Sequence, residues 1–165
     1  MVDARKLPAA PLTVEADGPE CAALAKRFGL VAIESLAAQL AFEPDGDDVV
    51  ARGHLRARIV QSCAVTGDDL PATIEEELLI RFVPEGAPGS PDEEIELDAQ
   101  DCDEVSFDGS RFDIGEAAAQ SLALAIDPYA TGPGADEIRE EAGLLGEGQA
   151  GPFAELAKLK KGKSD

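Results

Sequence analysis

Two stretches in the first half of the chain alternate clearly between apolar and polar residues. Over residues 49–63 the odd positions are mostly apolar, and four even positions carry basic side chains, namely Arg52, His54, Arg56 and Arg58. A period of two places alternate residues on opposite faces of a β-strand, so this stretch predicts a long, half-buried strand with a basic outer face. The alternation returns over 74–82, which predicts a hairpin that brings Arg58 close to Glu77.

Shorter patterns predict the remaining strands and a first helix. We expect strands at 12–14, around 94–98 and around 104–107, and a helix at 19–28 that has Pro19 in its first turn. Residues 36–43 fit the helix period as well as the strand period, and their alternation favours a strand. The dipeptide Asp108-Gly109 is typical of tight hairpin turns, so we expect a turn there, just before Arg111.

The stretch "FDIGEAAAQSLALAIDPYA" predicts a longer helix near 113–126. Asp113 is its expected N-cap, and Glu116, three residues later, is expected to complete a capping box. A residue that precedes proline is disfavoured in helical conformation, so Asp127 and Pro128 mark the end of the helix.

These elements predict an α+β fold. The expected architecture is a curved antiparallel sheet of about five or six strands, with a short N-terminal helix, one longer helix near 113–126 and a flexible C-terminal tail. Residues 1–130 are interpreted as a single domain, a size at which a chain buries a substantial core. Residues 131–165 are interpreted as a flexible acidic linker followed by a short basic amphipathic C-terminal segment, because the linker is rich in Gly, Pro and acidic residues.

The net charge of the chain limits the kinds of molecule that it is expected to bind. The chain has 34 acidic and 14 basic residues, a net charge of −20 at pH 7, and the last fifteen residues hold four lysines against two acids. The rest of the chain is therefore strongly acidic, which disfavours nucleic acid and anionic lipid as partners and favours basic proteins. Solubility or adaptation to salt would explain the acidity equally well.

The sequence also predicts a cellular compartment. No run of about 18 apolar residues is present, and the N-terminal residues lack the apolar segment of a secretory signal, so we expect neither a membrane span nor a membrane partner. The three cysteines, at 21, 63 and 102, are odd in number and widely spaced. Such usage is typical of a reducing cytoplasm, where we expect the protein to reside.

No pattern in the sequence indicates catalysis, a metal or a cofactor. His54 is the only histidine, and no cysteine or serine stands at a spacing that would pair it with a nucleophile. Cys63 has Thr66 at the position where a zinc motif would have a second cysteine. We therefore predict no catalytic residue, no metal ligand and no cofactor, and we expect Cys63 to be a small buried thiol at the end of a strand.

The basic residues offer a candidate contact surface. Side chains two residues apart on one strand face lie roughly 7 Å from each other, a spacing near that of nucleic-acid phosphates, so the row from Arg52 to Arg58 is a candidate RNA or partner contact. The competing interpretation is that these side chains pair with acids of neighbouring strands, Glu75 and Glu77 first. In the C-terminal segment, Lys158, Lys160 and Lys161 flank an apolar stripe that includes Phe153, a pattern typical of docking segments.

Several segments, taken in order, resemble the YceD family, the large ribosomal RNA subunit accumulation proteins. They are "CAALAKRFGL", "GHLRARIVQSCAVTGDDLPATIEEELLIRFVPE", "FDIGEAAAQSLALAIDPYA" and "PFAELAKLK". The positions that carry the family motif here are Cys63, Thr66, Asp113, Asp127, Pro128, Pro152 and Phe153. Many members have a second cysteine where this chain has Thr66, so a metal or redox role of that pair does not transfer.

The resemblance implies a role in accumulation of large-subunit (23S) ribosomal RNA, hence in ribosome biogenesis, and it implies no enzymatic activity. Combined with the charge, it predicts an acidic adaptor or escort for a basic large-subunit ribosomal protein or a pre-ribosomal particle. The alternative is an assembly factor that contacts rRNA directly through the Arg52–Arg58 strand face and the lysine-rich tail.

Overall fold

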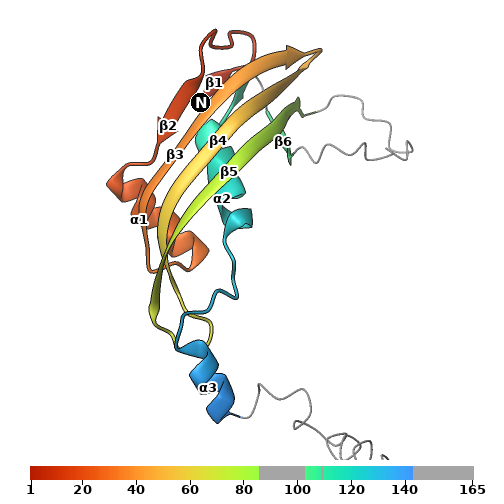
Figure 1. Cartoon of the computed structure of the whole chain (residues 1–165). Helices are drawn as coiled ribbons and strands as arrows, with labels where there is room; N and C mark the ends of the chain where they lie inside the picture. The colour runs from red at the N-terminus through yellow and green to blue at the C-terminus, as the bar shows by residue number, and fades with distance from the viewer. Residues whose placement is uncertain (86–102, 109, 143–165) are drawn as a thin grey trace, which may run out of the picture. The chain divides into compact units, whose positions relative to one another are not determined.

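The structure, a computed structural model, describes residues 1–85, 103–108 and 110–142 (Figure 1). The chain forms two compact units, one of Met1–Gln61 with Pro71–Asp127 and one of Ser62–Leu70 with Pro128–Asp165. In chain order the elements are β1 (Val2–Asp3), β2 (Leu12–Glu15), α1 (Gly18–Phe28), β3 (Ala32–Asp45), β4 (Asp48–Ser62), β5 (Asp69–Pro84), β6 (Asp103–Phe107), β7 (Arg111–Phe112), α2 (Ile114–Ala125) and α3 (Ala135–Glu141).

A five-stranded mixed sheet dominates the first unit, in the order β2-β3-β4-β5-β6. Figure 1 shows its long strands bending along their length. The prediction of a strand at 36–43 is confirmed, because β3 runs antiparallel to both β2 and β4. The expected purely antiparallel sheet is wrong, since β6 runs parallel to β5. A parallel pair needs a long crossover, and the chain between Pro84 and Asp103 is long enough to supply one.

The expected hairpin at Asp108-Gly109 is also wrong. Instead of turning back on β6, β7 pairs antiparallel with β1, with Val2 opposite Phe112. Burial of an aromatic side chain accompanies this pairing: the Phe112 ring stacks on Phe82 at 4.2 Å between ring centroids and is 1% exposed. Such a contact contributes about 0.5–1.5 kcal/mol beyond the burial of its area.

Alternation along the strands places the core on one face of the sheet. The core side chains from the three longest strands include Leu36, Leu40 and Phe42 of β3, Leu55, Ala57 and Ile59 of β4, and Leu78, Ile80 and Phe82 of β5. The same cluster contains Cys21 and Ala25 of α1 and Ile114, Ala118 and Leu122 of α2. Both helices therefore cover the apolar face of the sheet, and burial of each large aliphatic side chain contributes about 1.5–3 kcal/mol.

The two helices begin in different ways. In α1, which lies where a helix was expected at 19–28, the Asp17 carboxylate accepts the N–H of Glu20 and the Glu20 carboxylate accepts the N–H of Asp17, a complete capping box. In α2, the Asp113 carboxylate accepts the N–H groups of Gly115 and Glu116, as expected of an N-cap. The second half of the predicted box is wrong, because the Glu116 carboxylate accepts hydrogen bonds from Arg27 instead.

The second unit contains α3, which lies within the stretch expected to be an acidic linker. The expected strand near 94–98 and the basic C-terminal segment lie outside the described residues, and the predicted domain boundary at residue 130 stays a prediction. None of the helices in the described part of the chain has the length and apolar character that a membrane crossing requires.

Candidate functional site

The predicted basic row lies on β4, on the face of the sheet opposite the helices. Arg52, His54, Arg56 and Arg58 are all exposed, and they alternate with the buried Leu55 and Ala57. Their partners across the ladder in β3 are small or uncharged, namely Ala41, Gln39, Ala37 and Ser35. None of these four neighbours is charged, so the residues directly opposite in β3 offer the basic row no ion pair.

Two of the arginines pair with acids on the neighbouring strands. The Nε of Arg56 lies 3.0 Å from a carboxylate oxygen of Glu75, one of the two acids expected as partners. The Nε of Arg58 lies 3.7 Å from a carboxylate oxygen of Glu34 on β3, and the described residues contain no ion pair between Arg58 and the expected Glu77. All four side chains are more than half exposed, so each pair adds little to stability. Among the described residues, Arg52 forms no ion pair.

A shallow pocket of about 530 Å³ lies beside the basic row. It is lined on one side by Thr13, Gln39, His54 and Arg56, and on the other by Glu75, Glu76 and Glu77. Acidic and basic side chains both line this pocket, so it is specific neither for an anionic ligand nor for a cationic one.

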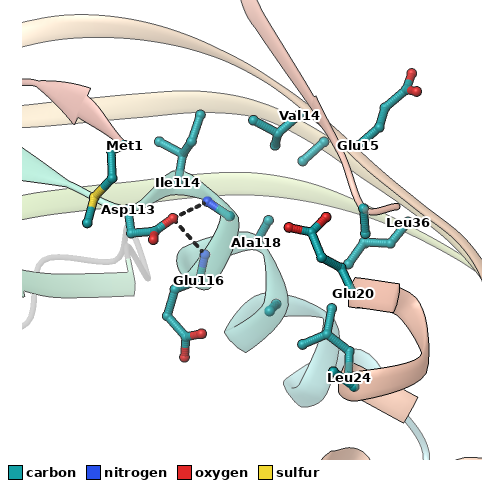
Figure 2. A pocket seen from close by; sticks show the side chains of 15 residues that line it. Met1, Val14, Glu15, Glu20, Leu24, Leu36, Asp113, Ile114, Glu116 and Ala118 are labelled. Carbon is teal, nitrogen blue, oxygen red and sulfur yellow. Dashed lines mark hydrogen bonds between the residues drawn. The ribbon is translucent and has the colours of Figure 1, made fainter. Parts of the chain in front are cut away.

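A larger pocket, of about 640 Å³, lies where β2, β3, α1 and α2 meet in the first unit (Figure 2). Apolar and polar groups contribute about equally to its lining, and the apolar residues are Met1, Val14, Ala16, Ala23, Leu24, Leu36, Ala38, Ile114, Ala118 and Ala119. Four carboxylates also line it, those of Glu15, Glu20, Asp113 and Glu116. This combination of apolar and acidic groups was not predicted from the sequence.

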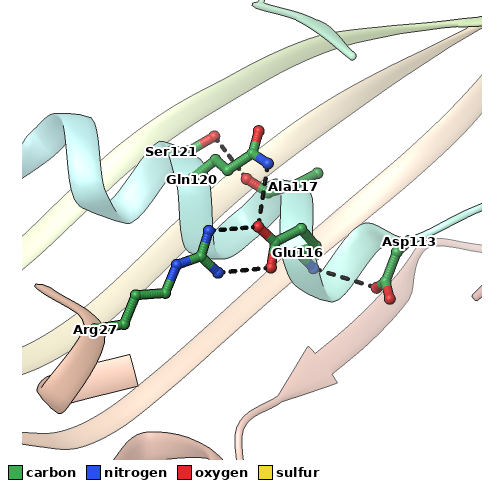
Figure 3. A network of polar contacts seen from close by, with 6 residues as sticks. All are labelled: Arg27, Asp113, Glu116, Ala117, Gln120 and Ser121. Carbon is green, nitrogen blue, oxygen red and sulfur yellow. Dashed lines mark hydrogen bonds and ion pairs between the residues drawn. The ribbon is translucent and has the colours of Figure 1, made fainter. Parts of the chain in front are cut away.

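A polar network joins the two helices next to that pocket. Figure 3 shows Arg27 reaching from α1 to the Glu116 carboxylate on α2, which also accepts a hydrogen bond of 3.2 Å from the Gln120 side chain. The hydrogen bonds from Arg27 and then Gln120 lower the pKa of Glu116, and the Glu116 carboxylate raises the pKa of Arg27. Glu116 is thereby held as an anion with a basic partner.

Cys63 lies in the second unit, and it is buried, as predicted. Its Sγ accepts the backbone N–H groups of Thr66 and Gly132, each at 3.3 Å. The Gly132 N–H contributes most, followed by the Thr66 hydroxyl and N–H and the Val65 N–H, and together they lower the pKa of the thiol from 9.0 to about 6, against the opposing effect of burial. A thiolate is therefore the main form at neutral pH, where a neutral buried thiol was expected.

The other predicted motif residues serve local roles or lie elsewhere. Asp113 caps α2 at the edge of the larger pocket, and Asp127 and Pro128 follow the end of that helix. The positions Pro152, Phe153, Lys158, Lys160 and Lys161 lie outside the described residues. Sequence reasoning missed Gly132, which is 69 positions from Cys63, since no local pattern connects the two.

The described residues contain no cluster of three or more His, Cys, Asp or Glu side chains that would suit a metal ion. No family model, no curated protein and no solved structure matches this chain.

Proposed function

We propose that this protein is a non-enzymatic ribosome biogenesis factor of the cytoplasm that supports accumulation of large-subunit (23S) ribosomal RNA. It acts as an acidic adaptor or escort that holds a basic ribosomal protein until delivery to the pre-ribosomal particle. The observation that carries the proposal is the surplus of carboxylates, because 34 acidic residues face only 14 basic ones.

This surplus cannot be neutralised within the chain. If every lysine and arginine formed its own ion pair, the net charge of −20 would still remain on unpaired acids. Several of the arginines are already engaged: Arg27, Arg56, Arg58, Arg81 and Arg139 each lie within 4 Å of a carboxylate. The resulting field attracts a basic protein over a distance of about 10 Å at 0.1 M salt. It also permits release when rRNA, a stronger polyanion, competes for the same basic partner.

Affinity capture tests this function. A tagged copy of the full chain, incubated with lysate at about 0.1 M salt, is expected to enrich basic large-subunit proteins or precursor particles, and about 0.5 M salt is expected to release them. An unrelated acidic protein of similar size and charge serves as the control, since charge alone would enrich basic proteins on both. Equal enrichment on the two baits, or none on this protein, would contradict the proposal.

The basic row on β4 favours a second candidate, a factor that contacts RNA directly. Arg52, His54, Arg56 and Arg58 share one uncovered face of the sheet, and Arg52 forms no ion pair with a described residue. In this case the triple variant Arg52→Gln, Arg56→Gln and Arg58→Gln loses RNA association while keeping its far-ultraviolet spectrum. RNA association that is unchanged in the triple variant excludes the row as the contact.

A further inference from the structure

We propose that the pocket between β2, β3, α1 and α2, here named the α1–α2 groove, is a docking site for a basic amphipathic segment of a partner protein. The apolar side chains of that segment would enter the groove, and its lysines or arginines would meet the carboxylates around it. This assignment rests on the proposed function in one respect, the basic character of the partner. It goes further by naming the part of the protein to which that partner binds.

About half of the groove's lining is apolar, and that part suits apolar side chains. Four of the lining residues are alanines, Ala16, Ala38, Ala118 and Ala119, whose short side chains leave room for a space of about 640 Å³. Pockets of a few hundred Å³ that combine apolar walls with a few polar groups are typical of sites that bind a ligand. Amphipathic helices bind such grooves with apolar residues at positions i, i+3 or i+4, and i+7.

The carboxylates of the groove determine the charge of the occupant. Glu15, Glu20, Asp113 and Glu116 all line it, and Glu116 alone has a basic partner within 4 Å among the described residues. Figure 2 shows the Glu20 carboxylate, on α1, turned toward the space next to Ala118 of α2. Three carboxylates without a basic partner, next to apolar side chains, are complementary to a segment that carries both apolar and basic side chains.

The hydrogen bonds that these acids already make leave their charge available. Glu20 accepts one backbone N–H at its Oε2, and Asp113 accepts two at its Oδ1, so each keeps a further carboxylate oxygen as an acceptor. Glu15 is exposed at the end of the edge strand β2, and it forms no hydrogen bond or ion pair with its side chain in the described ranges. Glu20 and Asp113 therefore offer free acceptor oxygens to a lysine or arginine of the partner, and the Glu15 carboxylate, which Figure 2 shows turned outward, adds negative charge at the rim of the groove.

Two substitutions of exposed residues on α1 test the groove: one blocks it and the other, its control, leaves it open. Ala23 is exposed and lines the groove, whereas its neighbour Ala22 is exposed and does not. Ala23→Trp therefore places an indole at the groove, and Ala22→Trp places the same side chain beside it as a matched control. For charge, Glu15→Lys reverses a groove carboxylate, and Glu137→Lys makes the same change on α3.

The probe is a fluorescein-labelled 14-residue peptide with leucines at helical spacing and lysines elsewhere, measured by fluorescence anisotropy against the full chain. A second peptide replaces the leucines by serine. We expect the lysine–leucine peptide to bind wild type and the two controls alike, and Ala23→Trp to weaken binding by about tenfold or more. Glu15→Lys is expected to weaken it several-fold, and the lysine–serine peptide to bind poorly.

Three results would overturn the assignment. Equal binding of the lysine–leucine peptide to Ala23→Trp and wild type would exclude the groove, and equal binding of the two peptides to wild type would indicate charge attraction alone. If sedimentation shows that the wild-type protein is a dimer and that Ala23→Trp is a monomer, the groove binds a second copy of the chain rather than another protein.

The capture experiment separates this assignment from the proposed function. If Ala23→Trp captures large-subunit proteins as well as wild type does, the function stands and the groove is not its site. If wild type binds the peptide in the groove but captures no large-subunit protein, the groove stands and the ribosomal role fails.

Discussion

Arg27 of α1 and Glu116 of α2 meet through two parallel hydrogen bonds. The Nη1 of Arg27 lies 2.8 Å from one carboxylate oxygen of Glu116, and the Nη2 lies 2.7 Å from the other. This two-pronged geometry is the strongest that an arginine and a carboxylate adopt. It joins two helices through residues that are 89 positions apart in sequence, and it explains why Glu116 does not complete the capping box of its own helix.

The first prediction concerns the pH dependence of this pair. Arg27 lowers the pKa of Glu116 below its ordinary value of 4.5, so the carboxylate stabilises the fold above about pH 4.5, and that contribution is lost as the pH falls through the lowered value. Glu116→Gln should therefore be less stable than wild type at pH 7 and no less stable at pH 2, as followed by urea unfolding. The difference should be small, because the two side chains are 50% and 43% exposed, and it should shrink in about 1 M salt.

Glu137→Gln on α3 is the matched control for that measurement. It removes an exposed carboxylate outside the α1–α2 network, so its stability should follow wild type at both pH values. A Glu116→Gln variant that differed from wild type equally at pH 7 and pH 2 would show that Glu116 acts through packing rather than charge.

The second prediction concerns Gly53, where β4 comes very close to β3. A Cβ at this position would stand 1.8 Å from the carbonyl oxygen of Gln39 and 2.8 Å from its carbonyl carbon. Both atoms belong to the backbone of a strand in the middle of the sheet, so no side-chain rotation relieves the clash. Gly53→Ala should lower the free energy of unfolding by about 3 kcal/mol or more, as measured by urea titration.

Gly18→Ala is the control for Gly53→Ala. Gly18 begins α1, and a Cβ there meets no atom within 4 Å, so the change should be neutral or slightly stabilising. Unfolding midpoints that fell equally in the two variants would show that the loss at Gly53 does not come from close approach of the strands.

The fold was predictable from sequence where the determining pattern is local. A period of two identifies β4 and β5, and favours a strand over a helix for β3, because alternate side chains face opposite sides of a strand whatever the strand pairs with. Partner choice is different, since it depends on contacts between distant residues. Nothing near Phe112 indicates that its ring will stack on Phe82, and that contact accompanies the pairing of β7 with β1.

The candidate site shows the same difference between local sequence patterns and contacts of distant residues. The basic row from Arg52 to Arg58 was predictable because one strand carries all of it. The α1–α2 groove was not, because its lining comes from Met1 and from four further stretches, around 14–16, 20–24, 36–38 and 113–119. The run of alanines in α2 was visible in the sequence, but only the structure shows which of them face a space and which pack against the sheet.

The third prediction concerns the ionisation of Cys63. Hydrogen bonds from Gly132 and Thr66 lower its pKa to about 6, whereas burial and the nearby carboxylates of Asp17 and Glu20 raise the pKa of Cys21. In a titration of Cβ chemical shifts by NMR, Cys63 should change with a midpoint near pH 6, and Cys21 should change only in alkaline solution. Thr66→Val removes the hydroxyl and keeps the backbone donor, so the midpoint of Cys63 should rise.

The lowered pKa of Cys63 also determines how the stability of the fold depends on pH. Since the pKa of Cys63 is lowered on folding, the thiolate stabilises the fold at alkaline pH, and the contribution is lost as the pH falls through about 6. Cys63→Ser should therefore lose more stability relative to wild type at pH 8 than at pH 5. A Cys63 midpoint near 9, equal in wild type and Thr66→Val, would contradict the role assigned to these hydrogen bonds.

The fourth prediction concerns the acids that compensate the basic row. Glu34 and Glu75 pair with Arg58 and Arg56, and they reduce the attraction of this face for a polyanion. The double variant Glu34→Gln and Glu75→Gln should bind a labelled single-stranded RNA several-fold more tightly than wild type, with a steeper dependence on salt. Fluorescence anisotropy at 50 and about 200 mM salt measures both quantities.

The control for that experiment removes the same charge elsewhere. Glu137→Gln and Glu140→Gln on α3 change the net charge by two without touching β3, β4 or β5, so RNA affinity should rise less than in the first double variant. Equal gains in the two variants would mean that net charge alone controls RNA binding. A specific gain at Glu34 and Glu75 would mean that these two acids keep RNA from the exposed arginines, which is the behaviour expected of a protein that serves a basic partner in the presence of RNA.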